Sequence, residues 1–135
     1  MNTGHLKIGE IGEEIACRFI EDNGYRVLKR NYRKNYGEID VIARSKERTL
    51  VFIEVKTVRG DGINGITPED NLTKSKLRKL SKTAAMFSAK HPELINERAG
   101  WRIDLVAIAL SNPEAVYHYL TDYTKYCVIR HYENI

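Results

Sequence analysis

The fold of this chain is decided by GEID at residues 37–40 and TLVFIEVK at residues 49–56. Apolar and β-branched residues dominate both stretches, as they do in β-strands, and the polar segment 45–48 between them has the composition of a turn. We therefore predict two strands, over 38–44 and 49–58, joined as a β-hairpin. Two acids and one lysine fall on these strands, and their relative placement determines what the hairpin can do.

The register of the hairpin decides which charged residues face each other. A turn centred on Glu47, with an odd number of loop residues, puts Asp40 opposite Glu54 and Glu38 opposite Lys56. Side chains directly opposed across a ladder lie about 5 Å apart at Cβ. Two facing carboxylates destabilise a ladder by roughly 0.2 to 1 kcal/mol, so we expect a cation to compensate Asp40 and Glu54.

A hard divalent cation fits this pair of acids. Mg²⁺ or Mn²⁺ takes oxygen ligands, and Asp40 and Glu54 offer carboxylates, to which the backbone oxygen of Val55 could add a ligand. Lys56 shares the face of Glu54 and lies about 6 to 7 Å further along the strand, where it could stabilise a phosphate or handle a proton. The alternative is that both acids are exposed on a sheet edge and that Lys56 forms a surface pair with Glu38.

A third acid comes from the first predicted helix, over residues 6–22, in which apolar residues recur at helical spacing until Asn23-Gly24 ends it. At about 100° per residue, Glu13 lies nearest the apolar arc, Glu10 points away from it and Glu14 is intermediate. We expect Glu13 to lean over the sheet toward the acid pair. The alternative is a boundary carboxylate engaged in a helical ion pair.

The remaining elements predict an α/β fold with a mixed central β-sheet flanked by helices. A short strand over 25–28 precedes the hairpin, and a helix from about 71 to 90 follows it and is ended by a His-Pro pair. A strand over 101–110 rejoins the sheet by a crossover. Residues 115–119 are a candidate fifth strand, and the tyrosine-rich tail after them fits no element clearly.

Length and composition indicate one domain over residues 1–135, with 42% hydrophobic and 30% charged residues. The chain contains 22 Lys and Arg and 18 Asp and Glu, and the resulting net charge of +4 favours polyanionic partners. The start of the chain lacks a secretory signal and no run is long enough to span a membrane. Cys17 and Cys127 show no disulfide or zinc spacing, so we expect a cytoplasmic protein. The glycines of segment 60–65 predict a mobile flap.

The second predicted helix is strongly basic. Such a run is either a solvated helix face or a surface that follows a phosphate backbone, because each basic contact strengthens binding to nucleic acid. Five basic residues fall within nine positions of this helix: Lys74, Lys76, Arg78, Lys79 and Lys82. The histidines have no metal-ligand spacing and are expected mostly at the surface. They are His5, His91, His118 and His131.

Five segments stand in order along roughly the first 110 residues: GEIGEEIA at 9–16, NYR at 31–33, GEID at 37–40, VFIEVK at 51–56 and RID at 102–104. Together they resemble the YraN-like family of small bacterial proteins. That family is similar to the Holliday junction resolvase branch of the PD-(D/E)XK nucleases. The resemblance implies a restriction-endonuclease-like core of order α-β-β-β-α-β, which the predicted elements also give.

The resemblance assigns roles by position. It puts the helix acid of the superfamily at Glu13, the strand Asp at Asp40, the Glu-x-Lys pair at Glu54 and Lys56, and a basic helix position at Lys76. Two positions depart from the pattern. Ile39 stands where a Pro often precedes the motif Asp, and the basic residue after the Glu-x-Lys strand is Arg59, one place later than expected.

The resemblance and the acid pair together predict a Mg²⁺- or Mn²⁺-dependent endonuclease that hydrolyses phosphodiesters in branched or structured DNA. Asp40 and Glu54, with Val55, would hold the metal, Glu13 would orient the attacking water and Lys56 would stabilise the developing charge. The residues expected to contact DNA are Lys74, Lys76, Lys79 and Arg59. Two symmetric cuts imply a homodimer. A nucleic-acid-binding module with vestigial acids, or a scaffold for protein partners, remains as an alternative.

Overall fold

The computed structural model describes residues 8–60, 72–118 and 120–135. It contains one five-stranded sheet with the strand order β1-β2-β3-β4-β5 and two long helices, α1 and α3. The elements are α1 Ile8–Asp22, β1 Arg26–Lys34, β2 Gly37–Arg44, β3 Leu50–Arg59, α3 Lys74–Lys90, β4 Trp101–Leu110, α4 Pro113–His118 and β5 Cys127–Tyr132, with 3₁₀ segments at Pro92–Leu94 and Leu120–Lys125.

The sheet is mixed, as predicted. β3 and β4 run parallel, from the pair Leu50–Trp101 to the pair Arg59–Leu110, and every other neighbouring pair of strands is antiparallel. A parallel pair needs a crossover, and α3 lies within it. The predicted α/β fold with the order α-β-β-β-α-β is therefore confirmed.

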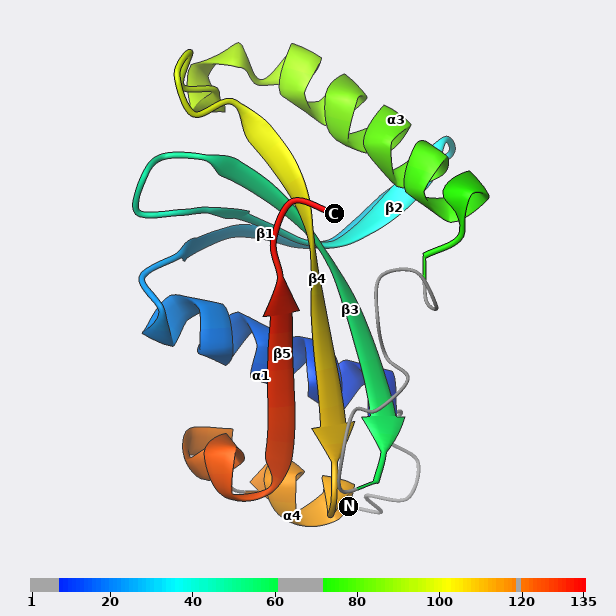
Figure 1. The fold of residues 1–135 in the computed structure, drawn as a ribbon, viewed down its shortest axis with the longest axis vertical. Helices are drawn as coiled ribbons and strands as arrows, with labels where there is room; N and C mark the ends of the chain where they lie inside the picture. The colour runs from blue at the N-terminus through cyan, green and yellow to red at the C-terminus, as the bar shows by residue number, and fades with distance from the viewer. Residues whose placement is uncertain (1–7, 61–71, 119) are drawn as a thin grey trace.

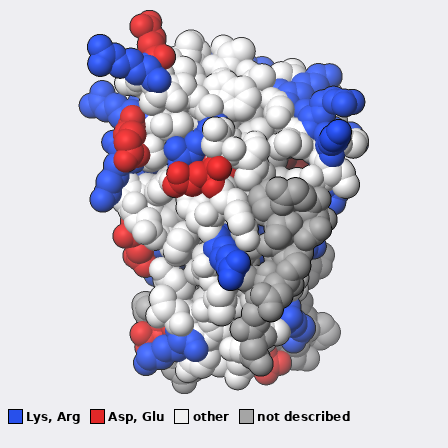
Figure 2. Space-filling view, viewed as in Figure 1, with Lys and Arg blue, Asp and Glu red and all other residues white. Residues whose placement is uncertain are grey.

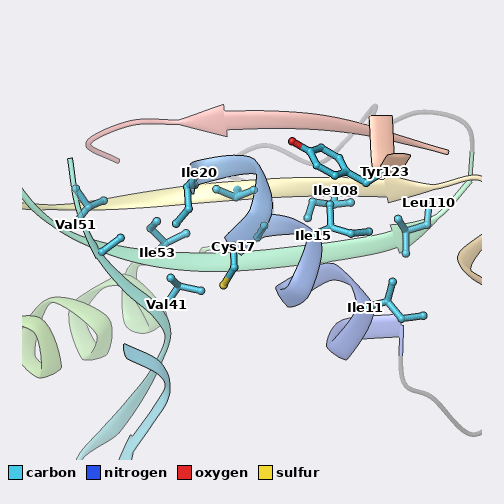
Figure 3. Packing of buried hydrophobic residues seen from close by; sticks show 13 residues of the cluster. Ile11, Ile15, Cys17, Ile20, Val41, Val51, Ile53, Ile108, Leu110 and Tyr123 are labelled. Carbon is cyan, nitrogen blue, oxygen red and sulfur yellow. The ribbon is translucent and has the colours of Figure 1, made fainter. Parts of the chain in front are cut away.

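α1 covers one face of the sheet. Its residues Ile11, Ile15, Cys17 and Ile20 are buried against strands β2, β3 and β4 (Figure 3). The helix ends where the sequence predicts, because Gly24 takes a φ of 88° that glycine adopts without strain. In Figure 1 α1 crosses behind the lower half of the sheet.

α3 covers the other face of the sheet, over buried residues of β1, β2, β3 and β4 (Figure 1). Leu80, Ala84 and Phe87 pack there against a second apolar cluster. The helix starts at Lys74, later than predicted, because the side chain of Thr73 accepts a hydrogen bond from the Lys76 amide and caps the first turn. It ends at Lys90, just before His91 and Pro92, as predicted.

β1 is longer than predicted. The sequence indicated only 25–28, but the strand runs from Arg26 to Lys34. Its second half is mostly charged and exposed because β1 is an edge strand, and within residues 30–34 only Tyr32 packs against the α3 face. Because this half of the strand lacks alternating apolar residues, the sequence did not predict it.

The predicted strand over 115–119 is wrong. Residues 113–118 form α4, which Pro113 favours because its fixed φ and missing N–H suit the first helical position. The fifth strand is β5 in the tail that the sequence did not place, and it pairs with β4 from Leu110–Cys127 to Leu105–Tyr132.

The β2–β3 register is the predicted one. The strands pair from Arg44–Leu50 to Val41–Ile53, which is the register centred on Glu47. The ladder ends there, however, and the strands diverge as a fork: β2 turns toward α3 while β3 continues away from it (Figure 1). Glu38 therefore pairs with Arg33 of β1 across the β1–β2 ladder, and its predicted pairing with Lys56 is wrong.

β2 twists at the fork. Regular alternation predicts that Asp40 shares a face with Ile42 and that Ile39 lies on the opposite face. Ile39 and Ile42 instead pack in the same cluster under α3. The neighbouring β1 follows this twist at Asn31, which has a φ of 50° and lies between the pairs Arg30–Val41 and Tyr32–Ile39. Asn tolerates that conformation better than most residues.

The C-terminal residues are tied to the sheet by a buried acid. Asp104 is fully buried and accepts hydrogen bonds from Arg102 Nε (2.9 Å), His131 Nε2 (2.7 Å) and the Asn134 amide (2.9 Å). Burial raises the pKa of Asp104, but these bonds outweigh it and hold the pKa below its usual value. His131, expected at the surface, is thus largely buried.

The remaining sequence predictions can be compared with the structure only where they fall on described residues. Within residues 8–60, 72–118 and 120–135, no helix combines the length and apolar composition needed to cross a membrane. Cys17 and Cys127 are both free thiols. Most of the predicted flap over 60–65, and His5, lie outside the described residues.

Candidate active site

The site is built at the fork between β2 and β3. The β2–β3 ladder ends at the pair Val41–Ile53. Beyond it, the backbone amide of Val55 in β3 points toward β2 and donates a hydrogen bond of 2.8 Å to Oδ2 of Asp40. A side chain thus replaces the backbone partner that β2 no longer supplies. Since the N–H and C=O of a strand residue point to the same neighbour, we expect the Val55 carbonyl to face this gap as well.

Three carboxyl groups meet at this point. Asp40 accepts hydrogen bonds from the carboxyl groups of Glu13 and Glu54 when these are protonated. All three side chains are intermediate in exposure, so the alternative of acids exposed on a sheet edge does not describe them. As predicted, Glu10 is exposed, and Glu14 forms its own ion pair of 2.7 Å with Arg30.

Burial and mutual repulsion shift the titration of this cluster. Burial, together with the charge of Asp40, raises the pKa of Glu54 to about 8. Burial also raises the pKa of Asp40, against the opposing effect of the Val55 N–H. Burial and the charge of Asp40 raise the pKa of Glu13, and Arg30 and Arg33 partly offset this. Ionising all three acids together is therefore costly without a cation.

Asp40 and Glu54 have the chemistry that a hard divalent ion requires. They present carboxylate oxygens to one space, and a cation there would relieve the repulsion that raises their pKa values. In the described part of the chain, no group of three or more His, Cys, Asp and Glu side chains is arranged to hold a metal. Mg²⁺ commonly binds proteins through one or two carboxylates and completes its shell with water and substrate phosphate.

A cavity of about 430 Å³ opens beside the acids, between β3 and α3. Glu54, Val55 and Lys56 line one side of it, and Lys76 and Lys79 of α3 line the other. Lys56 is exposed and forms no ion pair with any described residue; Glu38 instead lies 3.9 Å from Arg33. Cations from two elements thus face the same opening.

Two of the basic residues predicted to bind DNA lie elsewhere. Among the described residues, the cavity lining does not include Lys74 or Arg59. Lys74 begins α3, and Arg59 ends β3 three residues beyond Lys56. Figure 2 shows Lys and Arg side chains gathered at the upper right, over the N-terminal part of α3.

A close helix–strand contact sets the height of Glu13 above the sheet. Gly12 is buried against Thr57 of β3, and a Cβ at position 12 would lie 2.7 Å from the Thr57 Cβ and overlap its hydroxyl. Glycine therefore lets α1 approach β3 closely enough for the next residue, Glu13, to reach Asp40. The sequence alone gave no reason for this glycine.

Arg30 and Arg33 of β1 are the site neighbours that sequence reasoning missed. Both lie near enough to Glu13 for their positive charge to lower its pKa. The basic composition of RVLKRNYRK at 26–34 could have indicated them, but it lay outside the predicted strand. They add positive charge to the site from β1.

Comparison with known proteins gives a family. The model described as "Uncharacterised protein family UPF0102" matches residues 12–108, which include Glu13, Asp40, Glu54 and Lys56. The chain belongs to the UPF0102 family. UPF0102 is the YraN family, so the resemblance drawn from the sequence is confirmed at that level.

UPF0102 relatives occur in distant bacteria. A UPF0102 protein of Mycobacterium ulcerans is 35% identical over 116 residues, which cover 81% of this chain and 88% of the relative. One of Thermotoga maritima is 36% identical over 107 residues, covering 79% and 88%. One of Mycobacterium tuberculosis is 38% identical over 104 residues, covering 76% and 77%. The match therefore spans most of each UPF0102 chain.

Proposed function

We propose that this protein is a metal-dependent endonuclease that hydrolyses phosphodiesters in branched or structured DNA. The observation that carries the proposal is the fork itself, where the Asp40 carboxylate is fixed by the Val55 amide and meets Glu13 and Glu54. Acids with raised pKa values beside a cavity lined by lysines are suited to a divalent ion and a phosphate.

The residues divide the chemistry among them. Asp40 and Glu54, with the backbone of Val55, would hold Mg²⁺ or Mn²⁺, which when bound supplies Lewis-acid stabilisation of the phosphate and a more acidic water. Glu13 orients the attacking water. Lys56 stabilises the negative charge that develops on the phosphate, and Lys76 and Lys79 hold the backbone on the other side of the cavity.

Resolution of a branched junction requires two cuts related by symmetry, and we propose a homodimer with a two-fold axis for this reason. Two free cysteines are consistent with the reducing conditions of the cytoplasm, where we place the protein.

A non-catalytic nucleic-acid-binding module is the second candidate. It is favoured by the lysines that line both sides of the cavity, Lys56 on β3 and Lys76 and Lys79 on α3. In this case the lysines around the cavity bind a phosphate backbone, and the acids have only a structural role where β2 and β3 diverge.

A cleavage assay distinguishes the two. Pure protein is incubated with Mg²⁺ or Mn²⁺ and with labelled four-way junction, flap, single-stranded and duplex DNA. The nuclease proposal expects cutting of a structured DNA that EDTA and Asp40→Asn abolish. Salt-sensitive binding of DNA without cutting on any substrate would establish the module instead, and cutting that survives Asp40→Asn would overturn the assigned site.

A further inference from the structure

One edge of the sheet carries a continuous run of positive charge. β1 contains five Lys and Arg and no acid within RVLKRNYRK, and all five are exposed. They are Arg26, Lys29, Arg30, Arg33 and Lys34. Since β1 stands first in the strand order, its outer edge pairs with no strand among the described residues.

This edge is hollowed. A cavity of about 330 Å³ is lined by residues 29–34 of β1 and by Phe87 and His91 at the end of α3. Tyr32 and Phe87, which pack edge to face at 5.2 Å, are nearly buried and form the apolar part of the lining, while the basic residues supply its exposed part. The charges therefore surround a concave surface rather than scatter over a flat one.

Much of the charge is not neutralised within the molecule. Among the described residues, Lys29 makes no ion pair, and Lys34 makes only a cation–π contact, 5.5 Å from the Tyr32 ring. Arg33 lies 3.9 Å from Glu38, but both side chains are 74% exposed, so this pair contributes little. Of the cations in the hollow, Arg30 alone has a close acid partner among the described residues, Glu14 at 2.7 Å.

The hollow lies next to the candidate active site. Arg30 pairs at 2.7 Å with Glu14, the residue that follows Glu13, and the ladder pairs Arg30–Val41 and Tyr32–Ile39 flank Asp40. The twist of β1 at Asn31 accompanies the twist of β2 at Asp40. A linear polyanion that reaches the acids could thus continue along β1.

Protection of a sheet edge is the simpler explanation for such charges. Edge strands carry Lys, bulges and kinks that prevent pairing with other chains, and β1 has both a register shift after Val27 and the positive φ of Asn31. That explanation accounts for the charges themselves. It does not account for their arrangement around a hollow beside the acid cluster, which is what a phosphate backbone would require.

We propose that the β1 strip, defined as Lys29, Arg33 and Lys34 around this hollow, binds the sugar–phosphate backbone of DNA extending from the candidate active site. The identity of the ligand as DNA rests on the proposed function. The β1 strip is separate from the α3 lysines, so it would add a second contact region that determines how far the bound DNA extends.

Binding is measured without cutting. Fluorescence anisotropy of labelled four-way junction and duplex DNA is followed in EDTA over a range of NaCl concentrations. The variant Lys29→Ala/Arg33→Ala/Lys34→Ala leaves Arg30 and its Glu14 pair in place. Its control is Lys46→Ala/Arg98→Ala/Lys125→Ala, which also removes two lysines and one arginine from exposed positions but away from the hollow. Circular dichroism melting confirms that both variants fold.

The β1 variant should bind at least about tenfold more weakly near 0.1 M salt, and the slope of log K against log salt should shrink by about 3, one for each cation removed. The control should change affinity less than about twofold. Equal losses in the two variants, no loss in the β1 variant, or no binding by the wild type would each overturn the inference. Cleavage is measured separately. If the wild-type protein binds DNA through the β1 strip but never cuts it, the proposed nuclease activity is refuted and the proposed DNA binding by the β1 strip is retained.

Discussion

The carboxylate of Asp40 accepts a 2.8 Å hydrogen bond from the backbone amide of Val55, fifteen residues further along the chain. This bond lies where the β2–β3 ladder stops, so the acid that would hold a metal also completes the hydrogen bonding of β3. Substitutions at Asp40 must therefore be chosen to separate the two roles.

Asp40→Asn should abolish cleavage and leave the fold intact. The amide oxygen of Asn can still accept the Val55 hydrogen bond, but it is a weak metal ligand, so we expect at least a ~100-fold loss of rate. Asp40→Ala should also destabilise the protein by about 1 to 3 kcal/mol, because the Val55 N–H loses its partner. Cleavage assays, calorimetry with Mn²⁺ and urea unfolding measure these effects. Glu10→Gln, an exposed acid of α1, is the control and should change none of them.

The stability of the metal-free protein should fall as pH rises from about 5 to 8. The pKa of Glu54 is raised from 4.5 to about 8, so the folded protein holds a proton there that the unfolded chain has released. The associated stability is complete below the unfolded pKa and is lost as pH rises through the folded pKa. Glu54→Gln should remove this dependence, on the order of 3 kcal/mol, in urea unfolding with EDTA. Parallel pH profiles for the variant and the wild type would contradict the raised pKa.

Lys56→Ala should lower the rate of cleavage by about 100-fold without weakening metal binding. The lysine lines the cavity but is not a metal ligand, so calorimetry with Mn²⁺ should give the wild-type affinity. Lys56→Arg should recover part of the rate because it retains the charge. Lys46→Ala, an exposed lysine of the β2–β3 turn, is the control. Loss of metal affinity in Lys56→Ala would show that the lysine instead supports the acid cluster.

Two glycines of α1 should respond in opposite ways to alanine. Gly12→Ala would force α1 away from Thr57 and should cost about 1 to 3 kcal/mol. Gly9→Ala meets no atom within 4 Å and should be neutral or stabilise by up to ~1 kcal/mol through helix propensity. Thermal melting compares them. If the two variants melt alike, the close contact of Gly12 does not limit the position of α1.

The protein should be a dimer in solution if it makes paired cuts in branched DNA. Multi-angle light scattering should give a mass of twice 15.6 kDa at assay concentrations. A monomer, both free and on junction DNA, would contradict the dimer while leaving single-strand nicking open to test.

The regular spacing of apolar residues and the composition of the turns predicted most of the fold. The apolar spacing of α1, the turn at 45–48 and strand 101–110 gave the elements, and the centre at Glu47 gave the β2–β3 register. These predictions failed where tertiary contacts, rather than local sequence, determine the secondary structure. The second half of β1 is an exposed charged edge, and β5 follows a helix that local residues had suggested to be a strand.

The candidate site was predictable as a set of residues and not as an arrangement. Glu13 could be selected over Glu10 because helix geometry fixes which residue flanks the apolar arc. The placement of Asp40 could not be derived from alternation, because β2 twists where its ladder with β3 ends. The nearness of Arg30 and Arg33 to Glu13 depends on a strand that sequence pattern did not reveal.

The residue types, the order of the elements up to residue 110 and the β2–β3 register could be derived from the sequence, since these follow from local periodicity and turn position. Tertiary structure alone decided that the strands fork beyond Val41 and Ile53, that the Val55 amide fixes Asp40, and that Gly12 brings α1 close enough for Glu13 to join it. The reason is physical: a strand continues its ladder only while a partner remains in reach. Here the packing of β2 under α3 and of β3 against α1 draws the two strands apart.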